Sequence, residues 1–194
     1  IQVSPIDTSF VITGSGFTDD WKQRGILYKI QPDKSIVDSF FIEYPDRIFD
    51  RFQGQIVEND STIILGYNAV DTMTQAAKTN LIKVLSLQNI QFQTPIPAAA
   101  NTNAISYSLI KMSQNRMVVP IAYNNQTWVG SNYSHRIGLH EFDLSGNLTL
   151  NPLSPQDSLL GANVFGSKNN SGGIYIVCGL GEEISSVNPH LIYW

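Results

Sequence analysis

Charged side chains are scarce in this sequence. Asp, Glu, Lys and Arg make up 14% of its 194 residues, whereas soluble domains usually contain roughly 25%. The 12 basic residues are scattered along the chain, and the formal net charge is -4. Binding to a nucleic-acid backbone requires clustered Lys and Arg, so we expect no nucleic-acid partner.

Long apolar runs are also absent. No segment approaches the roughly 20 apolar residues that span a bilayer, so no membrane-spanning segment is predicted. The N-terminus lacks the basic stretch followed by an apolar stretch that marks a secretory signal. Because the chain starts at Ile1 rather than Met, we expect either a processed mature protein or a piece of a longer one.

Cysteine occurs only once, at Cys178, which excludes an intrachain disulfide. It lies in the apolar run GGIYIVCGLG, and free cysteine is among the most buried residue types, so we expect Cys178 to be shielded between apolar neighbours. A catalytic thiolate needs a His or a helix N-terminus to lower its pKa. Neither is near Cys178 in the sequence.

What the sequence does contain is an internal repeat. The segment LYKIQPDKSIV (27–37) returns as LIKVLSLQNIQ (81–91) and LHEFDLSGNLT (139–149), and LIYW (191–194) begins a fourth copy. In each full copy, a Leu opens a strand and an apolar residue closes it (Ile30, Val84 or Phe142). A second apolar residue follows six positions after the closing one (Ile36, Ile90 or Leu148). A second element precedes each copy: FVITGSG (10–16), IILGYN (63–68), MVVPIAYN (117–124) and IYIVCGLG (174–181).

The repeat, roughly 52 to 58 residues long, divides into four strands that we term A to D in chain order. In the second copy these are 54–58, 62–67, 80–84 and 90–94. Strands B and C are nearly continuous apolar runs, which indicates sheets covered on both faces. Four-stranded sheets covered by identical neighbours are the blades of a β-propeller. We therefore predict an all-β propeller chain of about four antiparallel blades, at 1–44, 45–98, 99–154 and 155–194.

These four blades are expected to form an arc of a larger ring, because the terminal copies are incomplete and would not complete one another. A ring of four blades is the alternative, since propellers have typically 4 to 8. One window contradicts the all-strand pattern: apolar residues in DTMTQAAKTNLIKVL (71–85) follow helical spacing. The repeat assigns 81–84 to a strand, so any helix should be confined to Thr72–Lys78.

The repeat resembles the propeller repeats of secreted and surface proteins of the Bacteroidota, in the pattern Leu, x, Lys, apolar, Asp-x-x-Gly-Asn, apolar. The residues that carry this resemblance are LYKIQPDKSI, LIKVLSLQNI and LHEFDLSGNL. Only the third has the full Asp-x-x-Gly-Asn turn, and the second has Leu-Ser-Leu-Gln-Asn in its place. The resemblance implies an exported, extracellular or cell-surface protein without enzymatic activity.

The B–C loops are the main candidates for binding, because long loops on a rigid scaffold are where binding residues concentrate. They are SGFTDDWKQR (15–24), NAVDTMTQAAKT (68–79), YNNQTWVGSNYSH (123–135) and LGEEISSVNP (180–189). Trp21, Trp128 and Tyr133 supply flat aromatic rings that stack on sugars or anchor protein interfaces. The preferred function is thus a non-catalytic binding or scaffolding propeller that engages a protein or glycan, or the remainder of its own ring. Alternatively, the aromatic residues cap gaps between blades.

Catalytic and metal-binding signatures are missing. The sequence has no Gly-x-Ser-x-Gly, His-Glu-x-x-His, Walker loop or Cys-x-x-Cys. His135 and His190 fall in equivalent strands of different copies, and zinc requires three or four convergent ligands. We therefore predict no catalytic residue, no metal site and no cofactor.

An enzyme is the alternative function. In that case the loop carboxylates Asp19, Asp20, Glu182 and Glu183 would serve as acid and base in part of a propeller-fold carbohydrate-active enzyme. That chemistry requires a suitable separation and perturbed pKa values.

Overall fold

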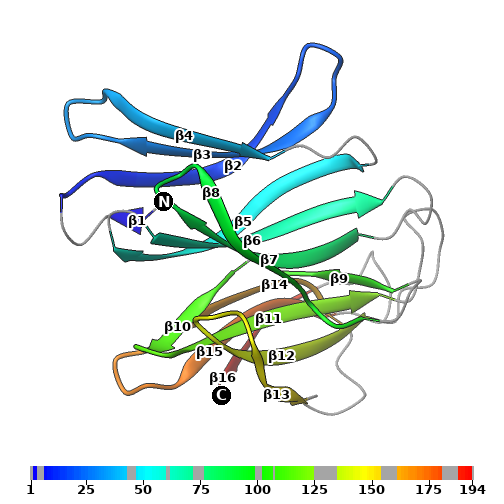
Figure 1. The fold of residues 1–194 in the computed structure, drawn as a ribbon. Coiled ribbons are helices and arrows are strands. Elements are labelled where there is room, and N and C mark those ends of the chain that lie inside the picture. The colour runs from blue at the N-terminus through cyan, green and yellow to red at the C-terminus, as the bar shows by residue number, and fades with distance from the viewer. Residues whose placement is uncertain are drawn as a thin grey trace.

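All the regular structure in the described part of the chain is β-strand. The computed structural model describes residues 2–3, 7–42, 47–59, 62–71, 77–98, 102–106, 108–124, 135–153, 161–180 and 188–193. Within these ranges there is no helix, and hence no helix long and apolar enough to cross a membrane. Figure 1 shows the strands as successive sheets stacked face to face.

The sheets follow one another along the chain as four blades. Blade 1 comprises β1 (Gln2–Val3), β2 (Phe10–Phe17), β3 (Gln23–Ile30) and β4 (Ile36–Ile42). Blade 2 comprises β5 (Arg47–Asn59), β6 (Thr62–Asp71), β7 (Ala77–Leu85) and β8 (Asn89–Pro95). Blade 3 comprises β10 (Ile110–Ser113), β11 (Arg116–Asn124), β12 (His135–Asp143) and β13 (Leu148–Leu153). The described strands of blade 4 are β14 (Gly161–Lys168), β15 (Ile174–Leu180) and β16 (Asn188–Tyr193).

Within each blade, consecutive strands pair antiparallel in the predicted order A to D. The four strands expected for the second repeat are all present, as β5 to β8. Strand β5 is longer than expected: it begins at Arg47 and continues through a register shift between Phe52 and Gln55. The helix expected up to Lys78 is wrong at its end, because Ala77 and Lys78 belong to β7 and pair with β6. Its remaining residues, 72–76, lie outside the described part of the chain.

An additional strand, β9 (Asn103–Ile105), lies between blades 2 and 3. It pairs antiparallel with β11 and, through Lys78 and Ala104, parallel with β7. Blades 2 and 3 are therefore joined into one continuous hydrogen-bonded sheet, as Figure 1 shows. The repeat did not predict this strand, because it has no counterpart among the described residues of the other copies.

Three apolar layers hold the blades together. The layer between blades 1 and 2 contains Val11, Leu27, Ile42, Phe52, Ile63, Leu65, Tyr67, Ala69, Ile82, Val84 and Leu87. The layer between blades 2 and 3 contains Ile56, Ile64, Leu81, Ile96, Ala104, Leu109, Met117, Val119, Ile121, Phe142 and Leu144. The layer between blades 3 and 4 contains Ile110, Val118, Ala122, Ile137, Leu139, Ile174 and Ile176.

The apolar runs of the B strands supply residues to the layers on both sides. In β6, Ile63 and Leu65 pack toward blade 1, whereas Ile64 packs toward blade 3. In β11, Met117 packs toward blade 2 and Val118 toward blade 4. Because successive side chains of a strand point to opposite faces, a continuous apolar run is what a sheet covered on both faces requires.

The C–D turns differ between copies. In blade 3, Asp143 accepts hydrogen bonds from the amides of Ser145 (2.9 Å) and Asn147 (2.8 Å). The blade 2 turn departs from this pattern: Ser86 and Leu87 both have positive φ, and Leu87 is buried in the layer between blades 1 and 2. In this copy, an apolar contact made by Leu87 takes the place of the hydrogen bonds that the Asp143 side chain accepts in blade 3.

Candidate functional site

The B–C connections lie at the ends of the paired B and C strands, and we call this edge of the blades the B–C rim. The last register pairs before these connections are Phe17 with Gln23 in blade 1, Val70 with Ala77 in blade 2 and Asn124 with His135 in blade 3. In blade 1 the connection itself is described, so it shows how this rim is built.

The blade 1 connection is a projecting hairpin rather than the expected loop of residues 15–24. Strand β2 continues to Phe17 and β3 starts at Gln23. Gln23 Nε2 also donates to Ser15 Oγ across the two strands at 2.6 Å. Figure 1 shows this ribbon extending away from the rest of blade 1, so the chain presents a stiff two-stranded arm with a short tip.

Thr18 organises the tip of this hairpin. The Thr18 amide donates to Lys22 O at 2.8 Å, the Trp21 amide donates to Thr18 O at 2.9 Å, and the Thr18 hydroxyl bonds to Asp20 Oδ1. Lys22 Nζ lies 3.2 Å from Asp20 Oδ2. This turn places Trp21 in the left-handed region, with φ of 63°. The Trp21 side chain is therefore held at the end of the arm by the backbone of its own turn.

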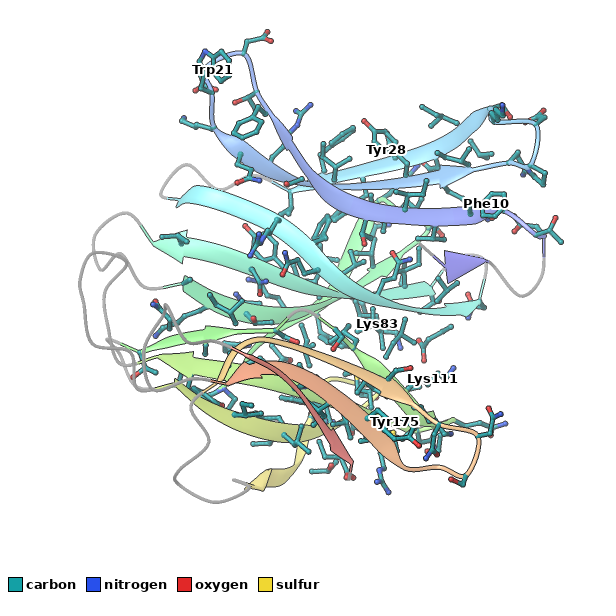
Figure 2. The ribbon with its side chains drawn as sticks, turned by 180° about the vertical axis from the view of Figure 1, so that it is seen from behind. Phe10, Trp21, Tyr28, Lys83, Lys111 and Tyr175 are labelled. Atoms are coloured by element: carbon teal, nitrogen blue, oxygen red, sulfur yellow. The ribbon has the colours of Figure 1, made fainter. Side chains whose placement is uncertain are left out.

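Trp21 and Phe17 form an exposed aromatic pair on this arm. Their ring centroids are 6.3 Å apart at an interplanar angle of 56°, a geometry that aromatic pairs favour. The exposed fractions are 63% for Phe17 and 83% for Trp21. Figure 2 shows Trp21 at the outermost point of the hairpin. Of the three aromatic residues predicted for this rim, Trp21 is placed here; Trp128 and Tyr133 lie outside the described residues.

Asp20, one of the two acidic candidates of this hairpin, does not have the properties of a general acid. Asp20 is exposed, and the hydrogen bond from Thr18, together with the Lys22 ammonium, lowers the pKa of its carboxyl. A general acid requires the opposite shift. Asp19 is exposed beside it, and Glu182 and Glu183 lie outside the described residues. Among the described residues, no three His, Cys, Asp or Glu side chains are grouped as a metal site would require.

Comparison with known proteins identifies the fold. No family model matches the chain, and no curated protein matches its sequence. Among solved structures, it is similar to the α-L-arabinanase of Penicillium chrysogenum complexed with arabinobiose, with a TM-score of 0.61 and 11% identity over 98% of this chain and 61% of that one. It is also similar to an ACO/RPE65 chimera, with a TM-score of 0.52 and 9% identity over 99% of this chain and 48% of that one.

The fold is a β-propeller. At identities this low the likenesses concern the fold alone, and the chain spans about three fifths of the arabinanase. The all-β propeller predicted from the repeat is confirmed, with four blades in the described structure.

A buried polar network lies beneath the propeller's B–C rim, and the sequence reasoning missed it. Asn68 Nδ2 donates to Ser106 O at 2.9 Å, and the Ser106 amide donates to Thr79 Oγ1 at 2.8 Å. The Thr79 hydroxyl in turn donates to Asn68 Oδ1. Nearby, Asn103 Oδ1 accepts from the Ala77 amide at 2.7 Å. These bonds attach the β9 segment to blade 2.

A second missed feature is the buried pair of Tyr123 and His140 between blades 2 and 3. The Tyr123 hydroxyl donates to Pro97 O at 3.3 Å and bonds to His140 Nε2. His140 stacks on Phe142, and its Nδ1 is buried without a partner. Burial lowers the pKa of His140 to about 4 and raises that of the Tyr123 hydroxyl. His140 is therefore neutral at pH 7. Because the Tyr123 hydroxyl donates its proton to Pro97 O, its oxygen is free to accept a hydrogen bond from the Nε2–H of His140.

The lowered pKa of His140 predicts that the free energy of unfolding depends on pH. The folded pKa of His140, about 4, lies below the value of about 6.5 expected for an unfolded chain. The unfolded state therefore binds more protons, and stability should fall as the pH drops below about 6.5 and continue to fall toward 4. Urea unfolding between pH 7.5 and 5 should show this slope, and His140→Gln should flatten it. Equal slopes for both proteins would contradict the assignment.

The remaining candidates can be placed only by register. Cys178 lies in β15 directly opposite His190 in β16, although the sequence suggested no histidine nearby. The sequence could have predicted this pairing, because Cys178 and His190 lie at equal distances from the middle of the connection between β15 and β16. The side chains of Cys178, His135 and His190 lie outside the described part of the structure, so the predicted shielding of Cys178 stays a prediction.

Proposed function

We propose that this propeller is a non-catalytic binding module that engages a protein or glycan partner through its B–C rim, with the tip of the β2–β3 hairpin as an anchor. The observation that carries the proposal is the exposed pair of Phe17 and Trp21 on a projecting, hydrogen-bonded arm. Leaving two large aromatic side chains in water forgoes roughly 1.5 to 3 kcal/mol of burial each. A partner surface that covers them recovers that free energy.

The arm is also preorganised for such a contact. The Thr18 hydrogen bonds fix the turn before any partner arrives, so little conformational entropy is lost when Trp21 becomes buried. Aromatic residues at the centre of a contact commonly dominate its binding energy. In keeping with the repeat resemblance, we propose that this contact is made outside the cell or at its surface.

A carbohydrate-active enzyme is the second candidate, and the likeness to an arabinanase is the observation that favours it. The lowered pKa of Asp20 argues against that carboxyl as the general acid of such an enzyme. Incubating the protein with arabinan and other glycans, followed by analysis of released reducing ends, tests the enzyme directly. Release that survives Trp21→Ala but is lost in a Glu182→Gln or Glu183→Gln variant would favour the enzyme over the binding module.

The binding proposal predicts a loss of affinity on truncating the aromatic pair. Ligands found on a glycan array, or identified from a surface extract and then purified, would be titrated against the wild type, Phe17→Ala, Trp21→Ala and the double variant. We expect each single variant to weaken binding by at least ~1 to 2 kcal/mol, about 5- to 30-fold.

Ile36→Ala is the matched control, because Ile36 is an exposed apolar residue of the same blade at the opposite rim. It should leave the affinity unchanged. If Ile36→Ala abolishes binding while both aromatic variants bind like the wild type, the wrong rim has been assigned.

A further inference from the structure

Most polar side chains at the tip of the β2–β3 hairpin are engaged with one another. The Thr18 hydroxyl bonds to Asp20 Oδ1 and accepts a hydrogen bond from the Lys22 amide at 3.1 Å. Lys22 Nζ lies 3.2 Å from the other oxygen of the Asp20 carboxylate. Below the tip, Gln23 Nε2 donates to Ser15 Oγ at 2.6 Å. These bonds leave few polar groups of the arm for a ligand.

The groups that remain available are two rings and two polar atoms or groups. Asp19 is exposed, and its carboxylate has no hydrogen-bond or ion-pair partner among the described residues. Trp21 is 83% exposed, and its indole N–H, which can only donate, is unpaired within the same part of the chain. The neighbouring Phe17 ring is 63% exposed. The tip therefore offers two aromatic rings, one N–H donor and one negative charge.

This set of groups fits a pocket in a protein better than it fits a sugar. A sugar carries a hydroxyl group on most of its carbon atoms, and hydroxyls that lose water on binding need polar partners around the aromatic ring. The bonds among Thr18, Asp20 and Lys22 withdraw such partners from the tip. The rings of Phe17 and Trp21 are also inclined at 56° to each other, so they form a wedge rather than a flat platform.

The charges beside the rings disfavour a lipid surface. Asp19 and Asp20 directly precede Trp21, and a carboxylate that follows the ring toward the hydrocarbon region is costly there. Lys22 is the one cation in the tip, residues 18–22, and it is already paired with Asp20. The tip thus lacks the unpaired basic groups that attract anionic lipids.

We propose that the partner of this arm is a protein with an apolar pocket that receives Trp21 and a Lys or Arg at the rim of the pocket that pairs with Asp19. The inference rests on the proposed binding function of the B–C rim and adds the chemistry of its partner. Trp21 is the anchor, because aromatic side chains in desolvated pockets dominate protein interfaces. Asp19 provides a charge at the edge of the contact, where a charge speeds association and selects the partner more than it adds affinity.

Cyclodextrins test this chemistry, because their ring encloses an apolar cavity whose rim can be made cationic. The probes are β-cyclodextrin, an amino-substituted β-cyclodextrin and linear maltoheptaose, which has the same glucose units without the cavity. Each would be titrated while the NMR signal of the Trp21 indole N–H is followed, with Trp21→Phe to assign it. We expect both rings to bind and the cationic ring to bind roughly two- to fivefold more tightly at low salt.

Asp19→Asn should remove the preference for the cationic ring. Asp33→Asn is the matched control, because Asp33 is exposed in the C–D turn of the same blade at the opposite rim. Its substitution changes the net charge equally and retains the oxygen that accepts from the Ser35 amide, so the preference should persist. Equal affinity of the wild type for the two rings, or failure of both to bind, would overturn the proposal.

Two further results would also overturn it. Maltoheptaose that binds as tightly as the neutral ring would indicate a sugar surface. Binding to phosphatidylserine–phosphatidylcholine vesicles that is lost in Trp21→Ala would indicate a lipid surface.

A partner identified from a surface extract and then purified separates failure of this inference from failure of the proposed function. We expect Asp19→Asn to slow association with that protein and to reduce its dependence on salt. If Trp21→Ala weakens binding but Asp19→Asn changes neither the rate nor the salt dependence, the arm binds the partner and only the charge pairing is wrong. If neither Trp21→Ala nor Phe17→Ala weakens binding, the proposed function itself fails.

Discussion

Phe142→Ala is expected to lower the free energy of unfolding by about 3 to 5 kcal/mol. Phe142 closes strand C of the third repeat, its side chain is 0% exposed, and it packs in the layer between blades 2 and 3. Removing the ring leaves a cavity between two sheets that β9 joins by hydrogen bonds. Because the blades cannot approach each other freely, the cavity should collapse little and the cost should be high.

Leu148→Ala serves as the control for this substitution. Leu148 stands six positions after Phe142 in the repeat and is 37% exposed, so its truncation should cost less than about 1 kcal/mol. Urea denaturation of the two variants and the wild type measures the difference. Similar losses for both variants would show that the layer between blades 2 and 3 is not an interior core.

The repeat predicted the fold because interior blades impose the same requirements on every copy. The Leu residues that the repeat placed at the start of strand C, Leu27, Leu81 and Leu139, lie inside β3, β7 and β12, which each begin four residues earlier. All three are buried, as their shared position requires. The residues that open strand D are apolar too, yet Ile36, Ile90 and Leu148 are exposed. Spacing thus predicted where strands lie, but it could not distinguish a residue between blades from one at their outer edge.

The site was less predictable, because its parts depend on contacts that the repeat does not contain. Trp21 became a binding candidate through its residue type and its loop, and that role stays a prediction. Residues 15–17 and 23–24 were wrongly assigned to the loop, since Ser, Gly and polar residues there lack a strand pattern. The network of Asn68, Thr79 and Ser106 was invisible for a similar reason. These small polar residues meet only when the β9 segment folds back across blade 2.

Strand β5 shows how a glycine misled the assignment of strand A. The apolar pattern suggested a start near Gly54, whereas the strand runs from Arg47 and passes Gly54 in a bulge between Phe52 and Gln55. A β-bulge inserts a residue without ending the strand, and a glycine with positive φ is a common way to form one. Gly54 has φ of 81°.

Gly54→Ala is accordingly expected to destabilise the protein by roughly 2 to 5 kcal/mol. A methyl group at this position would lie 2.7 Å from the Leu109 amide nitrogen and 2.9 Å from Ser108 backbone carbon atoms. The backbone that enters blade 3 would have to move, an overpacking cost of about 1 to 3 kcal/mol. The left-handed conformation adds about 1 to 2 kcal/mol for any residue with a side chain.

Gly172→Ala separates these two costs, because Gly172 has a similar φ of 91° but open space around it. It should show the backbone strain alone, about 1 to 2 kcal/mol, while Gly14→Ala, which has neither feature, should lie close to the wild type. Chemical denaturation of the three variants gives the ranking. If Gly54→Ala costs no more than Gly172→Ala, the bulge does not press against blade 3, and the close packing of β5 on residues 108–109 must be abandoned.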